Sequence, residues 1–151
     1  MLNINKQDIE KLVRSIIMEE YGNKINDSSK RHVDPSGVIS ISLPLFSVSE
    51  EDRLDTGNPN HKVYTKDLMS LAESPRLGCG LMVMEDTTFD WTLDYDEISN
   101  IIEGSLTIIV DGRRITANAG ELMYIPSGSS IKFSVEGKAS WIYVTYPADW
   151  Q

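Results

Sequence analysis

The sequence has few of the residues that build disulfides and metal sites. Its 151 residues include one cysteine, Cys79, and two histidines, His32 and His61. A single cysteine excludes a disulfide within the chain and a zinc site built from several cysteines. Cys79 begins the apolar run 79–84, which favours a buried structural thiol. Two histidines exclude a three-histidine metal site within one chain, so we expect no tightly bound transition metal.

Positive charge and long apolar runs are also scarce. Lysine and arginine total 14 against 23 aspartate and glutamate residues, which gives a formal net charge of −9. This sign opposes nucleic-acid binding, and an anionic ligand would need a basic group or a divalent ion such as Mg²⁺ beside it. No apolar run reaches the length of a membrane span, and the N-terminus lacks a signal-peptide pattern. We therefore expect a cytoplasmic protein with no membrane or nucleic-acid partner.

The chain is predicted to consist of three segments. Residues 1–21 form a short amphipathic helix, residues 22–36 a polar linker, and residues 37–151 a single folded domain. The apolar face of the helix either packs on this domain or on a second copy, or docks into a groove of another protein. The residues on that face are Ile9, Leu12, Val13, Ile16 and Ile17.

From residue 38 onward the sequence indicates an all-β fold, because short β-branched and aromatic runs alternate with turn residues. Asp111-Gly112 and Glu136-Gly137 predict hairpin turns, and residues 126–128 predict a tight corner. Many short strands with such turns favour a closed barrel or a jelly roll. The predicted strands are 38–42, 61–65, 79–85, 89–93, 97–103, 105–110, 113–116, 121–125, 131–135 and 139–146.

Two segments carry a specific spacing of glutamate, glycine and proline. Glu97 is followed after six residues by Gly104, and a second segment runs Gly120-x5-Pro126-x-Gly128. This pattern resembles the two motifs of the cupins. The resemblance implies a single cupin (RmlC-like jelly-roll) β-barrel, preceded here by the short N-terminal amphipathic helix.

The histidines that hold a metal in most cupins are missing. The two places before the glutamate hold Trp91 and Leu93, or Asp90 and Thr92, and the later place holds Ile131. An isoleucine side chain cannot donate an electron pair to a metal. None of the usual cupin metal-binding histidines is therefore present.

Glu97 is the one residue of the usual cupin metal site that the sequence keeps. It is either a structural carboxylate bonded to a nearby hydroxyl, or a general base or single anchor for Mg²⁺, since a carboxylate facing an apolar interior is unfavourable unless paired or used. We predict it as the catalytic residue. The substrate-binding residues predicted around it are Phe89, Trp91, Thr92, Tyr95, Ser99 and Tyr124.

The segments 89–104, 124–126 and 143–150 resemble the ethanolamine-utilisation protein Q family, a histidine-poor branch of the cupins. The resemblance spans residues 38 to 150. It implies a role in bacterial ethanolamine catabolism, within or beside a bacterial microcompartment. It also implies an acetate kinase activity that interconverts acetyl phosphate plus ADP with acetate plus ATP.

The sequence does not identify a phosphate-binding group for such a kinase, because it has neither a P-loop nor a protein-kinase motif. Arg113 and Arg114 flank a hairpin tip that we expect in solvent, and Lys132 is expected to point outward if Ile131 points inward. Asp94 or Asp96 would join Glu97 in holding Mg²⁺.

Two other functions are compatible with the same sequence. One is a non-catalytic assembly factor that bridges microcompartment shell and cargo proteins, and the other is a cupin that binds a small metabolite without chemistry. Cupins commonly dimerise, and twofold pairs are the commonest oligomers, so a homodimer is expected.

Overall fold

A computed structural model describes residues 6–21 and 30–151 of the chain. The chain divides into two compact units, residues 1–46 and residues 47–151. Residues 22–29 of the predicted linker lie outside the described residues. Within the described ranges, no helix is long and apolar enough to cross a bilayer.

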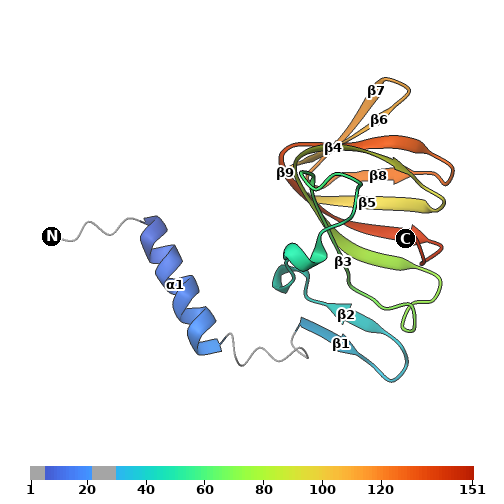
Figure 1. Cartoon of the computed structure of the whole chain (residues 1–151). Helices are drawn as coiled ribbons and strands as arrows, with labels where there is room; N and C mark the ends of the chain where they lie inside the picture. The colour runs from blue at the N-terminus through green and yellow to red at the C-terminus, as the bar shows by residue number, and fades with distance from the viewer. Residues whose placement is uncertain (1–5, 22–29) are drawn as a thin grey trace. The chain divides into compact units, whose positions relative to one another are not determined.

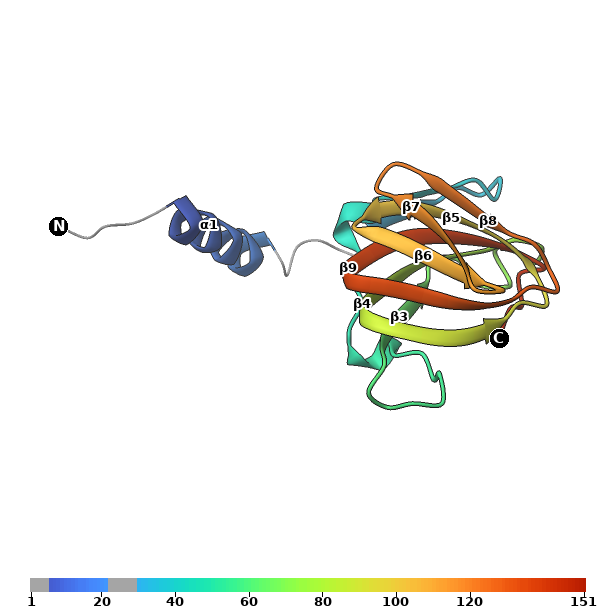
Figure 2. The same cartoon turned by 90° about the horizontal axis from the view of Figure 1, so that it is seen from above.

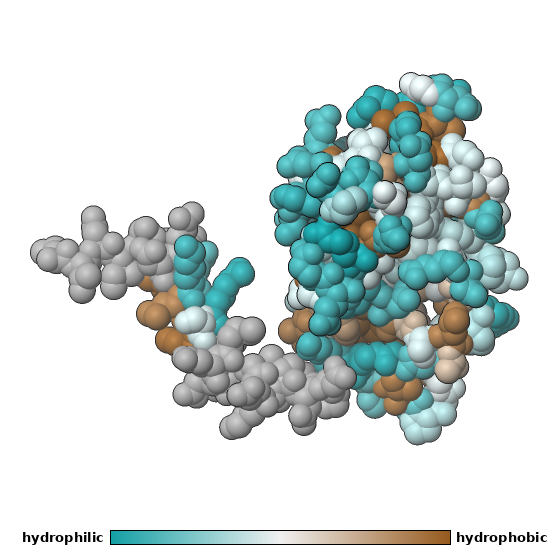
Figure 3. Space-filling model, viewed as in Figure 1, coloured by the Kyte–Doolittle hydropathy of each residue, from teal (hydrophilic) through white to brown (hydrophobic). Residues whose placement is uncertain are grey.

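The first unit contains the helix α1 (Lys6–Tyr21), where the sequence predicts one. Its apolar side chains Ile9, Leu12, Val13 and Ile16 are about half exposed, from 46% at Val13 to 59% at Leu12. Figure 3 shows such apolar side chains in brown beside polar ones in teal on this helix. The side chain of Ile17 lies outside the described side chains.

A small hairpin follows in the same unit. Strands β1 (Arg31–Val33) and β2 (Ile39–Ile41) pair antiparallel, and a 3-10 turn, η1 (Leu43–Leu45), comes after them. The sequence assigns 31–33 to the linker and 38–42 to the barrel, whereas the structure pairs these two segments with each other. Backbone bonds alone define strands of three residues, so no side-chain pattern reveals them.

The second unit is an antiparallel sheet of seven strands (Figures 1 and 2). A 3-10 turn, η2 (Glu50–Asp52), precedes the strands β3 (Lys62–Asp67), β4 (Gly78–Thr92), β5 (Asp96–Glu103), β6 (Ser105–Val110), β7 (Arg113–Asn118), β8 (Leu122–Ile125) and β9 (Ser130–Tyr146). The strand order is β3-β4-β9-β5-β8, and β6 pairs with both β9 and β7. The predicted all-β jelly roll is therefore confirmed, although the two ends of the sheet are not joined by backbone bonds between described residues.

The long strand β9 pairs with two different strands along one of its edges. Its residues 140–146 pair with β5, while residues 132–134 pair with β6, and β4 lies along its other side. Because one strand serves both parts, the sheet wraps round a common core. The core includes Trp141 and Leu106, which are 0% exposed.

The predicted hairpin turn at Glu136-Gly137 is wrong. Strands β4 and β9 run through residues 86 and 137 with a bulge, where the register shifts between Glu85 and Thr87. Gly137 has a φ of +72°, and its amide donates to the carboxylate of Asp86 at 2.7 Å. Glycine at positive φ suits a bulge as well as a turn, so the sequence does not distinguish the two.

The other predicted turns are confirmed. Asp111 and Gly112 both have positive φ, at 48° and 74°, between β6 and β7. At the corner 126–128, Gly128 has a φ of +85° and its amide donates to the carbonyl of Leu93 at 2.7 Å. This bond fastens the corner to the end of β4, beside the region that holds the candidate site.

Candidate functional site

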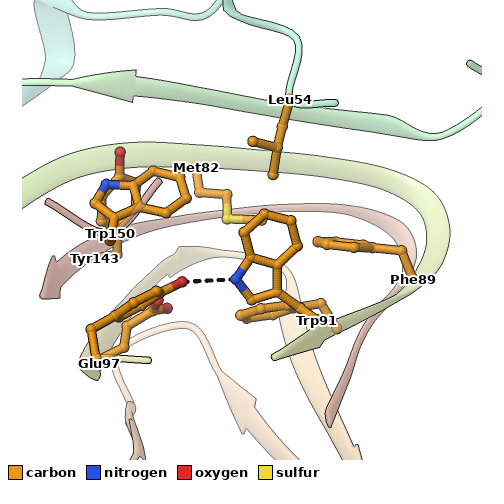
Figure 4. Close-up of a pocket in the computed structure, with 9 residues that line it drawn as sticks. Leu54, Met82, Phe89, Trp91, Glu97, Tyr143 and Trp150 are labelled. Atoms are coloured by element: carbon orange, nitrogen blue, oxygen red, sulfur yellow. Dashed lines mark hydrogen bonds between the residues drawn. The ribbon is translucent and has the colours of Figure 1, made fainter. Parts of the chain in front are cut away.

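The interior of the seven-stranded unit contains a narrow cavity (Figure 4). The free volume between its lining side chains is about 10 Å³, which is room for about one water molecule. Aromatic rings make most of the wall, and one carboxyl group interrupts it. The lining residues are Leu54, Met82, Phe89, Trp91, Tyr95, Glu97, Phe133, Tyr143 and Trp150.

Strand alternation brings these side chains together. On β4, Phe89 faces inward and Trp91 points to the same side, because residues two apart share a face. Glu97 on β5 lies opposite Thr145 of β9. Tyr143 lies two residues before Thr145 in β9 and is therefore on the same face of the strand. Residues distant in sequence therefore meet because β9 lies between β4 and β5.

Glu97 is a buried carboxyl group, and among the described residues one side chain donates a hydrogen bond to it. Its side chain is 5% exposed, and the Ser99 hydroxyl donates to its Oε1 at 2.8 Å. Burial raises the pKa of Glu97 to about 7, and the Ser99 bond opposes this only in part. No lysine, arginine or histidine is among the lining side chains. Near neutral pH both the protonated and the ionised forms of Glu97 are populated.

The polar groups of the aromatic side chains form hydrogen bonds with one another or with a carboxylate on β3. The indole N–H of Trp91 donates to the hydroxyl oxygen of Tyr95 at 2.8 Å, shown as the dashed line in Figure 4. The Tyr143 hydroxyl donates to Asp67 at 2.9 Å. Burial raises the pKa of Tyr95 and of Tyr143, so both stay neutral. Trp150 packs edge-on against Tyr143, with ring centroids 5.4 Å apart.

Gly80 on β4 makes room for this arrangement. A Cβ atom added there would overlap the hydroxyl oxygen and Cζ of Tyr143. Gly80 lies opposite Tyr143 in the β4–β9 pair. The ring of Tyr143 thus occupies the space that a side chain at Gly80 would fill.

A larger and more open hollow of about 440 Å³ lies outside the cavity. Leu54 and Trp91 line both spaces, so these two side chains form the boundary between them. Arg53 also lines the hollow, where its guanidinium bonds Glu50 at 2.8 Å and the hydroxyl of Tyr64 at 2.9 Å. The remaining lining residues are Glu51, Asp52, Asp55, Thr65 and Gln151.

The structure brings together four of the predicted site residues and places a fifth directly behind them. Phe89, Trp91, Tyr95 and Glu97 line the cavity, and Ser99 is fully buried against Glu97. Their roles in binding and catalysis stay predictions.

Thr92 and Tyr124 do not lie in the cavity, which corrects their predicted placement. Thr92 follows the inward-facing Trp91 and is exposed, with its hydroxyl 3.3 Å from that of Ser130. Tyr124 is 62% exposed on β8, and its hydroxyl donates to Asp96 at 3.1 Å. Neighbouring residues in a strand point to opposite faces, so both side chains lie on the outer surface.

The predicted outward position of Lys132 is confirmed. Its ammonium group is 2.6 Å from the exposed Asp90, while Ile131 is buried. Arg113 and Arg114 are exposed at the hairpin tip, with Arg113 3.5 Å from Asp111. None of these cations reaches the cavity lining.

Sequence reasoning missed five lining residues, namely Leu54, Met82, Phe133, Tyr143 and Trp150. The alternation of side chains along β4 and β9 could have indicated Met82, Phe133 and Tyr143. Each of them lies an even number of residues from an inward-facing core residue of its strand, and such residues point to the same face. No local pattern marks Leu54 or Trp150. Cys79 is half-buried, outside the lining, and burial raises the pKa of its thiol.

The donors around Glu97 do not fit a magnesium ion held by the protein. Mg²⁺ prefers six oxygen ligands in octahedral geometry, whereas Glu97 is the one carboxylate in an aromatic wall. Asp94 is exposed, and Asp96 accepts bonds from Tyr124 and from the Ser127 amide on the outer face. Across the described ranges, no three histidine, cysteine, aspartate or glutamate side chains are grouped to share an ion.

Comparison with known proteins gives a family match over nearly the whole chain. The family model described as "Ethanolamine utilisation protein EutQ" matches residues 4–151. "Acetate kinase EutQ" of Clostridioides difficile (strain 630) is 60% identical over 149 residues, which cover 98% of this chain and 95% of that protein.

Solved structures agree with this result. The structure of the Clostridium difficile EutQ protein has a TM-score of 0.78 at 64% identity, covering 80% of this chain and 88% of that one. The Cnp3 cupin domain of Schizosaccharomyces pombe has a TM-score of 0.55 at 13% identity, covering 72% of this chain and 68% of that one. The second likeness shows the cupin fold alone.

Proposed function

The chain belongs to the ethanolamine utilisation protein EutQ family, and we propose that it is an acetate kinase acting at the mouth of the cavity that contains Glu97. The reaction is acetyl phosphate plus ADP to acetate plus ATP, in either direction. Its support is the name of the relative that is 60% identical over 98% of this chain.

The observation that carries the site is a protonatable carboxyl group just inside an open hollow. The hollow, at about 440 Å³, is within the range of small-molecule sites. Phosphates and nucleotide would occupy the hollow, and the neutral acetyl end would reach Leu54 and Trp91, which border the inner cavity. The protonated form of Glu97 would then donate a hydrogen bond to the acetyl oxygen.

The chemistry in this proposal is phosphoryl transfer by direct displacement. An oxygen of the ADP β-phosphate bonds to phosphorus while the bond from phosphorus to the acetyl oxygen breaks, and acetate leaves. A hydrogen bond from Glu97 stabilises the charge that develops on that oxygen. Mg²⁺ is proposed to enter with the nucleotide and to neutralise its phosphates, because the residues around Glu97 do not fit the ion.

The test follows ATP formation from acetyl phosphate, ADP and Mg²⁺ by purified protein. Glu97→Ala is expected to lower kcat/KM by about 100-fold, the usual contribution of one positioned proton-handling group. Thr92→Ala, on the outer face of β4, is the matched control and is expected to keep the full rate. A tag-only purification measures contaminating host kinase, and equal rates in all samples would assign the activity to contamination.

A second function is favoured by the exposed apolar stripe of α1. We propose that Ile9, Leu12, Val13 and Ile16, each about half exposed, dock the chain to a shell or cargo protein of a bacterial microcompartment. Full-length Leu12→Asp is expected to lose co-purification with shell protein, and exposed Lys11→Gln to retain it. If Leu12→Asp still co-purifies with shell protein, the stripe has no docking role. If Glu97→Ala keeps the full biological function of the protein, that function is assembly and not the kinase reaction.

A homodimer is proposed through the outer face of β5 and β8. Ile98 and Tyr124 lie opposite each other there, and with Leu122 they are 47–68% exposed. Exposed apolar patches of this kind mark association surfaces. Light scattering is expected to give twice the chain mass of 17.0 kDa for the wild type. The Leu122→Lys variant is expected to have the mass of a single chain. Leu77→Lys, exposed elsewhere, serves as the control, and a wild-type monomer at micromolar concentration would reject the dimer.

A further inference from the structure

We propose that the inner cavity binds the head group of a small, unbranched primary ammonium ion, with Glu97 as its counter-ion and the rings of Trp91, Tyr95 and Trp150 around it. This goes beyond the kinase, because the binding requires neither nucleotide nor phosphate. The ligand class is R–NH3⁺ with a short polar or apolar tail.

Charge favours a cation over an anion at this site. Glu97 is the only acidic side chain in the lining, and the lining has no basic one. The faces of aromatic rings carry negative potential, and they attract cations and repel anions. The formal charge of the whole chain, −9, acts in the same direction.

No described residue that lines the cavity supplies the counter-ion that a buried carboxylate needs. The side chain of Glu97 is 5% exposed, and within the described part of the chain its one bonded neighbour is the neutral hydroxyl of Ser99 on Oε1. Uncompensated burial of a carboxylate is unfavourable, and an ammonium group beside it supplies both opposite charge and hydrogen-bond donors. The raised pKa of Glu97, about 7, has this same cause.

Size restricts the ligand to a primary ammonium. The free volume of about 10 Å³ admits a group the size of water, which an –NH3⁺ group matches and a trimethylammonium group exceeds. The tail would pass Leu54 and Trp91, which line both spaces, and enter the outer hollow of about 440 Å³. Figure 4 shows Leu54 at the top of the cavity, Trp91 at its right and Glu97 at its lower left.

Ammonium binding is linked to the proton on Glu97. The ligand pairs with the ionised form, so binding at pH 7 is expected to release about half a proton per ligand. The other titratable groups that face Glu97 are Tyr95, which follows β4, and Tyr143 on β9, with Asp67 of β3 bonded to the latter. Because the kinase proposal uses the protonated form, the amine would compete with the acetyl substrate.

The test is calorimetric titration of the full chain with ethylammonium and 2-hydroxyethylammonium chloride, without nucleotide or acetyl phosphate. Ethanol, acetate and tetramethylammonium are the comparison probes, and both primary amines are expected to bind at least tenfold more tightly than any of them. Affinity is expected to fall about tenfold from pH 8 to pH 6, following the ionised fraction of Glu97. Glu97→Gln should weaken binding at least tenfold, and Thr92→Ala should leave it unchanged.

Proton release needs no variant, and it is measured on wild-type protein by titrating in two buffers of different ionisation enthalpy. Equal heats in both buffers, equal binding of tetramethylammonium or acetate, or undiminished binding by folded Glu97→Gln would each overturn the proposal. Because no kinase substrate is present, amine binding in a protein without kinase activity would reject the kinase alone. Kinase activity without amine binding would reject this inference alone.

Discussion

Replacing Gly104 with alanine is expected to lower the free energy of unfolding by about 3 kcal/mol, from left-handed backbone strain and overpacking together. Gly104 has a φ of +73°, and an added Cβ would overlap the backbone carbonyl oxygen of Lys138. That carbonyl belongs to β9, which pairs with β4 at Lys138 and with β5 from Ser140 onward. A strand held from both sides cannot move away cheaply, so the clash is not relieved by a side-chain rotation. Urea unfolding followed by tryptophan fluorescence measures the change.

Gly112→Ala is the matched control for Gly104→Ala. Gly112 has nearly the same φ, +74°, but nothing lies within 4 Å of a Cβ added there. It is expected to lose about 1 kcal/mol, the part that backbone conformation alone contributes. If the two variants were equally destabilised, the close approach of Gly104 to β9 would have no energetic consequence.

Gly104 also shows why the fold could be predicted from so few residues. The motif glycine Gly104, separated from Glu97 by six residues, is required by the crossing of two chain segments, not by a local turn alone. A residue type fixed by such a tertiary contact is informative about the whole fold. Gly120 and Gly128, with φ of +88° and +85°, mark turns at the two ends of β8, where backbone conformation alone favours glycine because nothing lies within 4 Å of an added Cβ.

Strand lengths and face assignments were less predictable for physical reasons. The run Leu122-Met123-Tyr124-Ile125 is apolar throughout, so alternation does not reveal that Met123 points inward and Tyr124 outward. The exposed Tyr124 and Leu122 carry no polar mark of the outer face. When both faces of a strand carry apolar residues, the sequence does not show which residues point inward.

The most distant parts of the candidate site have no local signal at all. Leu54 enters the lining because its amide bonds to the carbonyl of Val63 at 2.9 Å, which fastens the segment after η2 to β3. Trp150 enters because the end of the chain returns to Tyr143 and Tyr95. Both placements follow from long-range packing, which periodicity in a single segment cannot express.

The second large effect is expected in the pH dependence of stability, and it concerns Glu97. Its pKa is about 7 in the folded protein against a reference value of 4.5. The folded state therefore holds the proton more tightly than the unfolded chain between these values. The contribution of this tighter proton binding to the free energy of unfolding is fully present below pH 4.5. It is lost as the pH rises through 7. At 1.36 kcal/mol for each pH unit, the loss amounts to about 3 kcal/mol.

Glu97→Gln keeps the shape of the protonated carboxyl group but cannot ionise. Its free energy of unfolding is expected to equal that of the wild type near pH 4 and to exceed it by about 3 kcal/mol at pH 8, because the buried negative charge is gone. Guanidinium unfolding of both proteins at the two pH values measures this, with exposed Glu136→Gln as the control. A difference that does not change with pH would mean that the carboxylate has a partner in the folded protein. If 2-hydroxyethylammonium is that partner, adding it at pH 8 should stabilise the wild type and leave Glu97→Gln unchanged, since only the ionised carboxylate gains from a bound cation.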